Sequence, residues 1–246
     1  MARLAKPGKR RGHGFWAYLV PLFSFLLILE LKGRAPEVWT GVFFALQVAV
    51  PGGLFLRFAL RGDYPELRGF RPGPGLALDV LVGLAGAAIW LVPFVWVDAW
   101  RPDDTGAFDP EQLGSSRVGL ALTLRAVGYT VVTPFVEELF MRSWLLRYAE
   151  VFDRRKDFRD VPIAHRTLRS FAIVLVFFVG SHVPWEMPVM LVWVIGTQLW
   201  FYHRRHMVAI IVVHAVTNLA IFAFVVLFDG RLSDGSGQPI SLWFFI

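Results

Sequence analysis

The residues in this sequence that are best able to do chemistry are charged side chains inside apolar stretches. Glu137 and Glu138 are adjacent, and Arg142 follows the second of them by four residues. On a helix, neighbouring residues point about 100° apart, whereas residues four apart share a face. We therefore expect Glu138 to pair with Arg142 through a bidentate guanidinium contact and to serve as a structural carboxylate. Glu137 has no such partner, which makes it the better candidate for a general base.

Two histidines in apolar runs have polar or aromatic residues at the same helical spacing. His214 and Asn218 are four residues apart, so an imidazole and an amide share one face. Donors of this kind can form an oxyanion hole. Phe178 and His182 have the same spacing, and we expect the ring to buttress the imidazole while Gly180 allows a close helix approach.

Each of these patterns alone also fits a structural role, because membrane helices use ion pairs and polar side chains to hold one another. We interpret four further polar residues of the apolar runs in that way, rather than as substrate contacts. They are Gln47, Asp79, Arg125 and Gln198.

The composition is that of a membrane protein. Of the 246 residues, 56% are hydrophobic and only 18% are charged, and the mean hydropathy is +0.54. Cysteine is absent, which excludes disulfides, thiolate metal sites and cysteine nucleophiles. The formal charge is +6, but the basic residues lie in short segments between apolar runs. Lipid and membrane topology explain this placement better than nucleic-acid binding does.

Seven apolar runs must position the candidate residues. We expect an all-α, polytopic transmembrane helical bundle with about seven spanning helices, or between six and eight. No internal repeat is present, so the whole chain is expected to be a single domain. Two of the runs are short, and the prolines Pro184 and Pro188 between them favour a bend inside the membrane. The runs are residues 15–31, 38–60, 76–97, 118–139, 170–183, 189–202 and 208–228, and an apolar tail at 240–246 either lies at the interface or packs on the bundle.

The distribution of basic residues predicts the orientation. If the N-terminus is cytoplasmic, 19 of the 25 Lys and Arg residues fall in the inside segments. The positive-inside rule therefore favours a cytoplasmic N-terminus and an external C-terminus. We interpret the first run as a retained anchor rather than a cleaved signal peptide, because of its length and the charged Lys32 and Arg34 behind it.

Three motifs in this order carry a resemblance to a known family. They are EELFMR at 137–142, FVGSH at 178–182 and HAVTN at 214–218. The chain resembles the CPBP intramembrane proteases, which include the Rce1-type CAAX prenyl endopeptidases and the Abi proteins of bacteria. The motif-bearing region covers about residues 119–227, and the motifs show no departure from the family pattern.

The resemblance implies a glutamate-dependent endopeptidase without a metal or other cofactor. Glu137, aided by His182, would activate a water molecule, and His214 with Asn218 would stabilise the tetrahedral intermediate. Glu138, Arg142 and Phe178 would support the site. The implied partners are the lipid bilayer and a peptide or protein substrate, membrane-anchored in some members, and the implied location is a bacterial inner (plasma) membrane. The family's prenylated substrates do not carry over to this chain.

Three other classes of function remain open on the sequence. A zinc protease could use Glu137, His182 and His214 as ligands, although the chain has no His-Glu-x-x-His motif. A non-catalytic scaffold or immunity-type protein could use the same fold to bind a partner. A transporter would usually show repeated halves, which this sequence lacks.

The depth of His182 conflicts with that of the other candidates. His182 lies 13 residues beyond Arg169, about 20 Å along a helix. Glu137 and His214 are expected in the cytoplasmic third of their helices. We therefore expect residues 164–169 to extend the fifth helix into the cytoplasm, so that His182 is less deep than it first seems.

Overall fold

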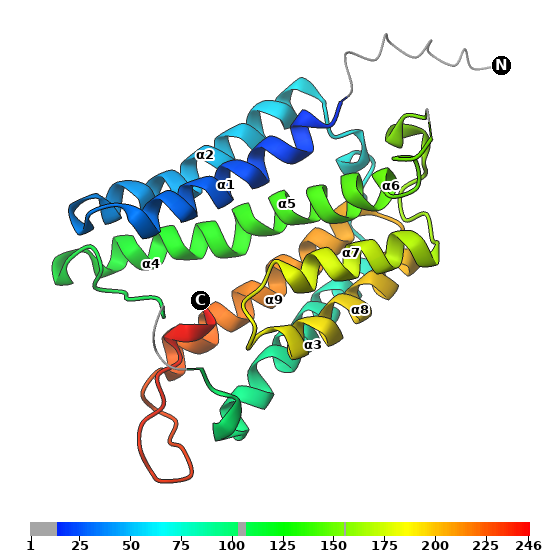
Figure 1. Ribbon diagram of the computed structural model, residues 1–246. Coiled ribbons are helices and arrows are strands. Elements are labelled where there is room, and N and C mark those ends of the chain that lie inside the picture. The colour runs from blue at the N-terminus through cyan, green and yellow to red at the C-terminus, as the bar shows by residue number, and fades with distance from the viewer. Residues whose placement is uncertain (1–13, 103–106, 155) are drawn as a thin grey trace.

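A computed structural model describes residues 14–102, 107–154 and 156–246, and it is a bundle of long helices (Figure 1). The described residues contain no strand, only an isolated bridge between Ser233 and Pro239. The expected all-α polytopic bundle is thereby confirmed. Its helices are α1 (Trp16–Arg34), α2 (Thr40–Arg61), α3 (Pro74–Trp96), α4 (Val118–Val127), α5 (Thr133–Glu138), α6 (Leu146–Tyr148), α7 (Leu168–Gly180), α8 (Met187–Arg204) and α9 (Met207–Phe228).

All seven apolar runs form helices, but they differ in length. Among the described residues, five helices are long and apolar enough to cross a membrane: α1, α2, α3, α9 and the continuous helix Ser115–Tyr148 that contains α4, α5 and α6. In contrast, α7 has 13 residues, which is about 20 Å and less than the ~30 Å of a hydrocarbon core. The helices α7 and α8 run side by side and return to the same end of the bundle (Figure 1). The bend between them is residues 181–186, and Pro188 lies in the first turn of α8.

Two glycines of α3 set its distance from α9. A Cβ on Gly83 would lie 2.7 Å from Cβ of Val216, and one on Gly86 would lie 2.7 Å from Oγ1 of Thr217. The two backbones can approach this closely only because both positions lack a side chain. Gly180 was expected to serve in this way, but a Cβ there would meet open space, so that expectation was wrong.

The helix Ser115–Tyr148 extends farther than its apolar run and contains two π turns, Gly128–Val132 and Leu139–Leu145. Glu137 therefore lies 11 residues before the end of this helix at Tyr148, not near its end. His182 lies 14 residues after the start of α7 at Leu168. Because α6 and α7 are neighbours, these similar spacings bring Glu137 and His182 to the same level.

The predicted extension of the fifth helix is therefore both unnecessary and wrong. The side chain of Thr167 caps α7 by accepting a hydrogen bond from the backbone N–H of Ser170, so the helix begins at Leu168. Ala164 has a φ of 57°, which is incompatible with a helix at that position.

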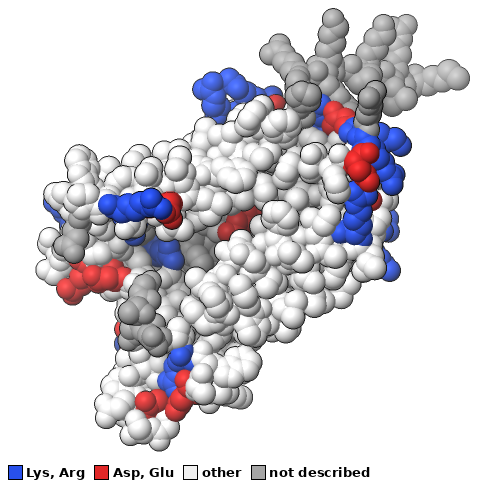
Figure 2. Space-filling model, in the orientation of Figure 1, with Lys and Arg blue, Asp and Glu red and all other residues white. Residues whose placement is uncertain are grey.

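The two ends of the bundle differ in charge. The start of α1, the end of α6 and the start of α7 lie at one end, where Lys and Arg gather, and α9 finishes at the other (Figures 1 and 2). The tail at 240–246 packs on the bundle, with Ile240, Leu242, Phe245 and Ile246 buried. Its last residues form part of the wall of the cavity described next.

Candidate active site

A cavity of about 490 Å³ lies between α1 and α2 on one side and α3, α8 and α9 on the other. It is visible as a hollow that contains both acidic and basic side chains (Figure 2). All four residues predicted to be catalytic line it, namely Glu137, His182, His214 and Asn218. Three segments far apart in the sequence, namely α5, the bend after α7, and α9, therefore contribute to one site.

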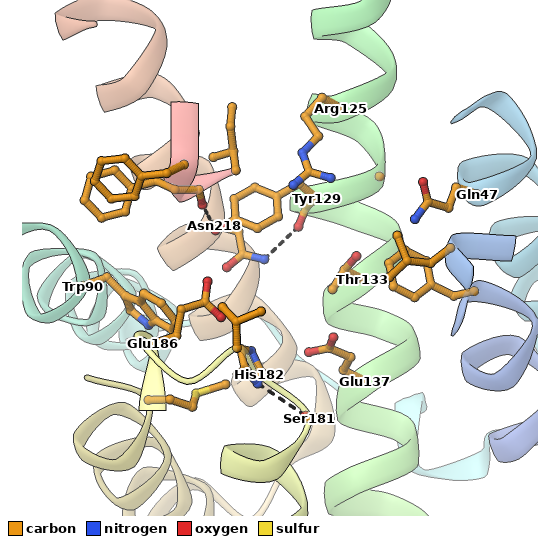
Figure 3. Close-up of a pocket in the computed structure, with 18 of the residues that line it drawn as sticks. Gln47, Trp90, Arg125, Tyr129, Thr133, Glu137, Ser181, His182, Glu186 and Asn218 are labelled. Carbon is orange, nitrogen blue, oxygen red and sulfur yellow. Dashed lines mark hydrogen bonds between the residues drawn. The ribbon is translucent and has the colours of Figure 1, made fainter. Parts of the chain in front are cut away.

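Glu137 projects from α5 into this cavity, and its side chain is 19% exposed. Its Oε2 lies 3.9 Å from Nε2 of His214, which is longer than a hydrogen bond. Figure 3 shows Glu137 and His182 on opposite walls, each pointing into the cavity. The space between them can hold a small reactant.

His182 stands in the bend after α7, and a backbone carbonyl holds its ring. Its Nδ1 lies 2.8 Å from the carbonyl oxygen of Phe178 and 3.3 Å from Oγ of Ser181. Because a carbonyl can only accept, Nδ1 carries the hydrogen and Nε2 keeps a free lone pair in the neutral ring. The Phe178 ring was expected to buttress this imidazole. Instead the ring lies under the guanidinium of Arg142, 4.7 Å from its centroid, and the carbonyl of Phe178 orients His182.

Glu138 and Arg142 form the predicted pair, and both side chains are fully buried. The contact differs from the expected bidentate fork, because Nη1 of Arg142 alone donates to both carboxylate oxygens. The other donors of Arg142 bind α8: Nη2 donates to Oγ1 of Thr197 at 2.6 Å and Nε to Oε1 of Gln198 at 3.0 Å. Arg142 thus connects the long helix with α8.

The same carboxylate also holds a catalytic candidate, a contact that spacing could not reveal. Nδ1 of His214 lies 2.9 Å from Oε1 of Glu138. Since a carboxylate only accepts, Nδ1 carries the hydrogen, and Nε2 can donate only when the ring is an imidazolium. The indole of Trp193 packs edge-on against this ring at a centroid distance of 5.0 Å. Glu138 is therefore more than the partner of Arg142.

Asn218 donates from Nδ2 to the backbone carbonyl of Tyr129 at 2.8 Å. This carbonyl lies in the π turn Gly128–Val132, where the N–H of Thr133 reaches back five residues to the carbonyl of Gly128. The next bond in that register would come from residue 134 to Tyr129, but Pro134 has no N–H. Asn218 supplies the missing donor, and its second amide hydrogen remains for another acceptor.

Two charged residues of the cavity were not predicted to belong to a site. Glu186, at the start of α8, lies near His182 and points into the cavity (Figure 3). Burial, and to a smaller extent the nearby Glu137, raises the pKa of Glu186 to about 7. Nothing in the sequence marked Glu186 as a site residue, because it is one acidic residue in a polar bend. Arg125 also lines the cavity, although it was interpreted as a structural residue.

Of the other polar residues in the apolar runs, two connect helices and one lines the cavity. Asp79 accepts bonds from Arg204 Nε at 2.8 Å and Trp200 Nε1 at 2.9 Å, and Gln198 accepts from Arg142, so both act between helices as expected. Gln47 lines the cavity instead.

Over the described residues, no group of three or more His, Asp and Glu side chains is placed to hold a metal ion. The His and Glu side chains named for the zinc alternative therefore do not form a ligand cluster in this arrangement.

Residues 119–220 match the family model described as type II CAAX prenyl endopeptidase Rce1-like. This part of the chain is Rce1-like. The match begins in α4, ends in α9 and includes all three motifs, so the resemblance seen in the sequence is confirmed. Neither the curated proteins nor the solved structures gave a match to the chain. The protein is accordingly an integral membrane protein whose Rce1-like segment contains the whole candidate site apart from the outer walls of the cavity.

Proposed function

We propose that this protein is an intramembrane endopeptidase in which Glu137 is the general base. The observation that carries this proposal is that Glu137, His182, His214 and Asn218 line a single cavity inside a match to the Rce1-like family. The substrate is a peptide segment that enters the cavity from the bilayer or from the adjoining aqueous phase. The orientation proposed is a cytoplasmic N-terminus in a bacterial plasma membrane.

In the first step, a water molecule between Glu137 and His182 attacks the carbonyl carbon of the scissile bond. The water proton passes to Glu137, and the oxygen forms the new bond. Nε2 of His182 accepts the second hydrogen bond of this water, because Nδ1 is committed to the carbonyl of Phe178. The oriented water then needs no further base.

The negative oxygen of the intermediate is stabilised by His214 and Asn218. Asn218 retains one amide hydrogen after binding Tyr129. His214 donates from Nε2 as an imidazolium, and the carboxylate of Glu138 stabilises that charge through Nδ1. When the intermediate collapses, the C–N bond breaks and the proton held by Glu137 passes to the leaving amine.

The test is cleavage of a peptide library by the protein purified in detergent, with product masses as the readout. Glu137→Gln should leave the fold intact and abolish the products of the wild type. Glu30→Gln is the matched control, because Glu30 lies on α1, is exposed and, among the described residues, pairs with Arg34. Products from Glu137→Gln at the wild-type rate would refute the base assignment. A wild-type protein that cleaves no peptide would favour the scaffold function.

A further inference from the structure

Arg125 belongs to a row of residues that ends at the proposed base. Arg125, Tyr129, Thr133 and Glu137 are four residues apart in succession, and all four line the cavity. An α-helix alone would rotate such a row away from the cavity, because it has 3.6 residues per turn. The wider π turn at Gly128–Val132 compensates for this drift. The row places Arg125 and Glu137 on the same wall (Figure 3).

The guanidinium of Arg125 has no acceptor among the described residues. Its Nε is buried without a hydrogen-bond partner, and no carboxylate of the described residues lies within ion-pair distance. Two aromatic rings flank it, with centroids 5.6 Å away for Phe108 and 5.4 Å away for Tyr129. Rings hold a cation in place but leave its hydrogens unpaired. A buried donor without an acceptor is costly, so this group is arranged for a partner other than the described residues.

The charges of the cavity are separated along its length. Arg125 lies toward one end, and Glu137 and Glu186 lie with His182 toward the other (Figure 3). Lys32 adds a second cation near Arg125, with Nζ 5.2 Å from the centroid of Phe44 in the cavity wall. A peptide whose anionic group lies at the Arg125 end would complement this field.

The spacing sets the length of that peptide. Twelve residues separate Arg125 from Glu137, which is roughly 18 Å along the helix. An extended peptide covers about 3.3 to 3.6 Å per residue, so about five residues span the same distance.

We propose that Arg125 binds a carboxylate of the peptide substrate, about five residues from the bond that is cleaved beside Glu137. This inference rests on the proposed function and adds a specificity determinant to it. The carboxylate is either the C-terminal α-carboxylate or an acidic side chain, because a planar guanidinium fork fits both. The two acids in the same cavity disfavour a doubly charged phosphate.

Equilibrium binding tests the inference separately from catalysis. Fluorescent peptides of matched sequence would be titrated onto the full-length Glu137→Gln protein in detergent. One set carries a free or an amidated C-terminus, and a second carries Glu or Gln at one internal position. Free carboxylate should improve binding roughly tenfold or more, with an optimum near five residues from the cleaved bond in peptides that the wild type cuts. Arg125→Met should remove this preference, and Arg125→Lys should retain part of it.

Arg117→Met is the matched control, because Arg117 lies in the first turn of the same helix, is exposed and does not line the cavity. Equal binding of carboxylate and amide peptides by the parent protein would overturn the inference. A preference that survives in Arg125→Met would also overturn it. If the preference requires Arg125 but the wild type cleaves no peptide, the carboxylate site stands and the proposed function falls. With an active wild type, Arg125→Met should raise KM for carboxylate peptides and leave kcat within about threefold.

Discussion

The amide of Asn218 occupies the place of a backbone N–H that Pro134 cannot provide. Its Nδ2 lies 2.8 Å from the carbonyl oxygen of Tyr129, the acceptor that the π turn leaves open. This bond fixes α9 against the long helix at the level of the cavity. Asn218 therefore has two roles. One amide hydrogen makes a structural hydrogen bond, and the other is the proposed oxyanion donor. The two roles can be separated by mutation.

We expect Asn218→Leu to destabilise the protein by roughly 1 to 3 kcal/mol, because the carbonyl of Tyr129 becomes a buried acceptor without a donor. Adding Pro134→Ala supplies an N–H that can donate to this carbonyl, so part of the stability should return. Cleavage activity should stay low in the double variant, since the oxyanion donor is still absent. Thermal midpoints in detergent and single-turnover cleavage measure the two effects.

Pro51 provides the control for this pair, because it also lies inside a membrane helix. Pro51→Ala should not restore the stability of Asn218→Leu. If neither proline substitution helps, the unpaired carbonyl is not the cause of the loss.

The two adjacent glutamates should respond differently to the same substitution. Glu137→Gln keeps the volume and should lower the chemical rate by ~10²-fold or more, with little change in thermal midpoint. Glu138→Gln weakens the contacts of the buried Arg142 and of His214, so both stability and rate should fall. Breaking one side of a buried ion pair costs roughly 3 to 5 kcal/mol.

Arg142→Met added to Glu138→Gln removes the orphaned cation and should recover part of the stability. It should not recover the rate, because His214 still lacks its carboxylate. A well-folded but inactive Glu138→Gln together with a fully active Glu137→Gln would reverse the two roles.

Stability should depend on pH through Glu186. Its pKa is about 7 in the folded protein, above the ordinary 4.5, so between these values the folded state keeps a proton that the unfolded state loses. The free energy of unfolding should therefore fall as pH rises from about 4.5 to about 7 and then level off. Glu186→Gln removes this loss, so the variant should be more stable than the wild type at pH 8, by at most roughly 3 kcal/mol, and equal to it near pH 4. Thermal midpoints across this range, with exposed Glu30→Gln as control, decide it; an equal difference at every pH would contradict the assignment.

The ends of the chain should lie on opposite sides of the membrane. The basic end of the bundle is where α1 starts, and α9 finishes at the other end (Figures 1 and 2). Reporters fused after Ile246 should be active only outside the cytoplasm, and reporters fused before Met1 only inside it. A cytoplasmic signal from the C-terminal fusion would require an even number of crossings.

Prolonged chelation should leave peptide cleavage unchanged, because the proposed base is Glu137 and the described residues bring no group of three His, Asp or Glu side chains together as metal ligands. The rate would be measured before and after chelation, and again after stoichiometric Zn²⁺. Loss of activity that Zn²⁺ restores would revive the zinc mechanism.

Local periodicity predicted the helices and the Glu138–Arg142 pair, because both depend on residues within one turn of each other. It also identified the four residues that meet in the cavity, but only together with the family motifs. Residue spacing could not show that Glu138 also binds His214, a contact between residues 76 positions apart.

Two of the errors have a common cause in where helices begin and end. The length of the apolar run at 118–139 predicts that Glu137 lies near the end of its helix. Amphipathic residues after this run continue the helix to Tyr148. The side chain of Thr167 caps α7, so this helix starts at Leu168, later than the start predicted from the absence of a helix breaker at 164–169. Arg125 was assigned to structure because a charge in an apolar run gives no sign of whether it has a partner.

The π turn at Gly128–Val132 also affects how related sequences should be aligned. Removing one residue from this turn would rotate everything beyond it by about 100° relative to Arg125. Glu137 would then leave the face that Arg125 occupies, although both residues would still be present in the sequence. In a relative with a one-residue gap here, the residue aligned with Arg125 would not share a face with the residue aligned with Glu137. Matching arginines by alignment column alone would therefore pair residues that do not correspond in space.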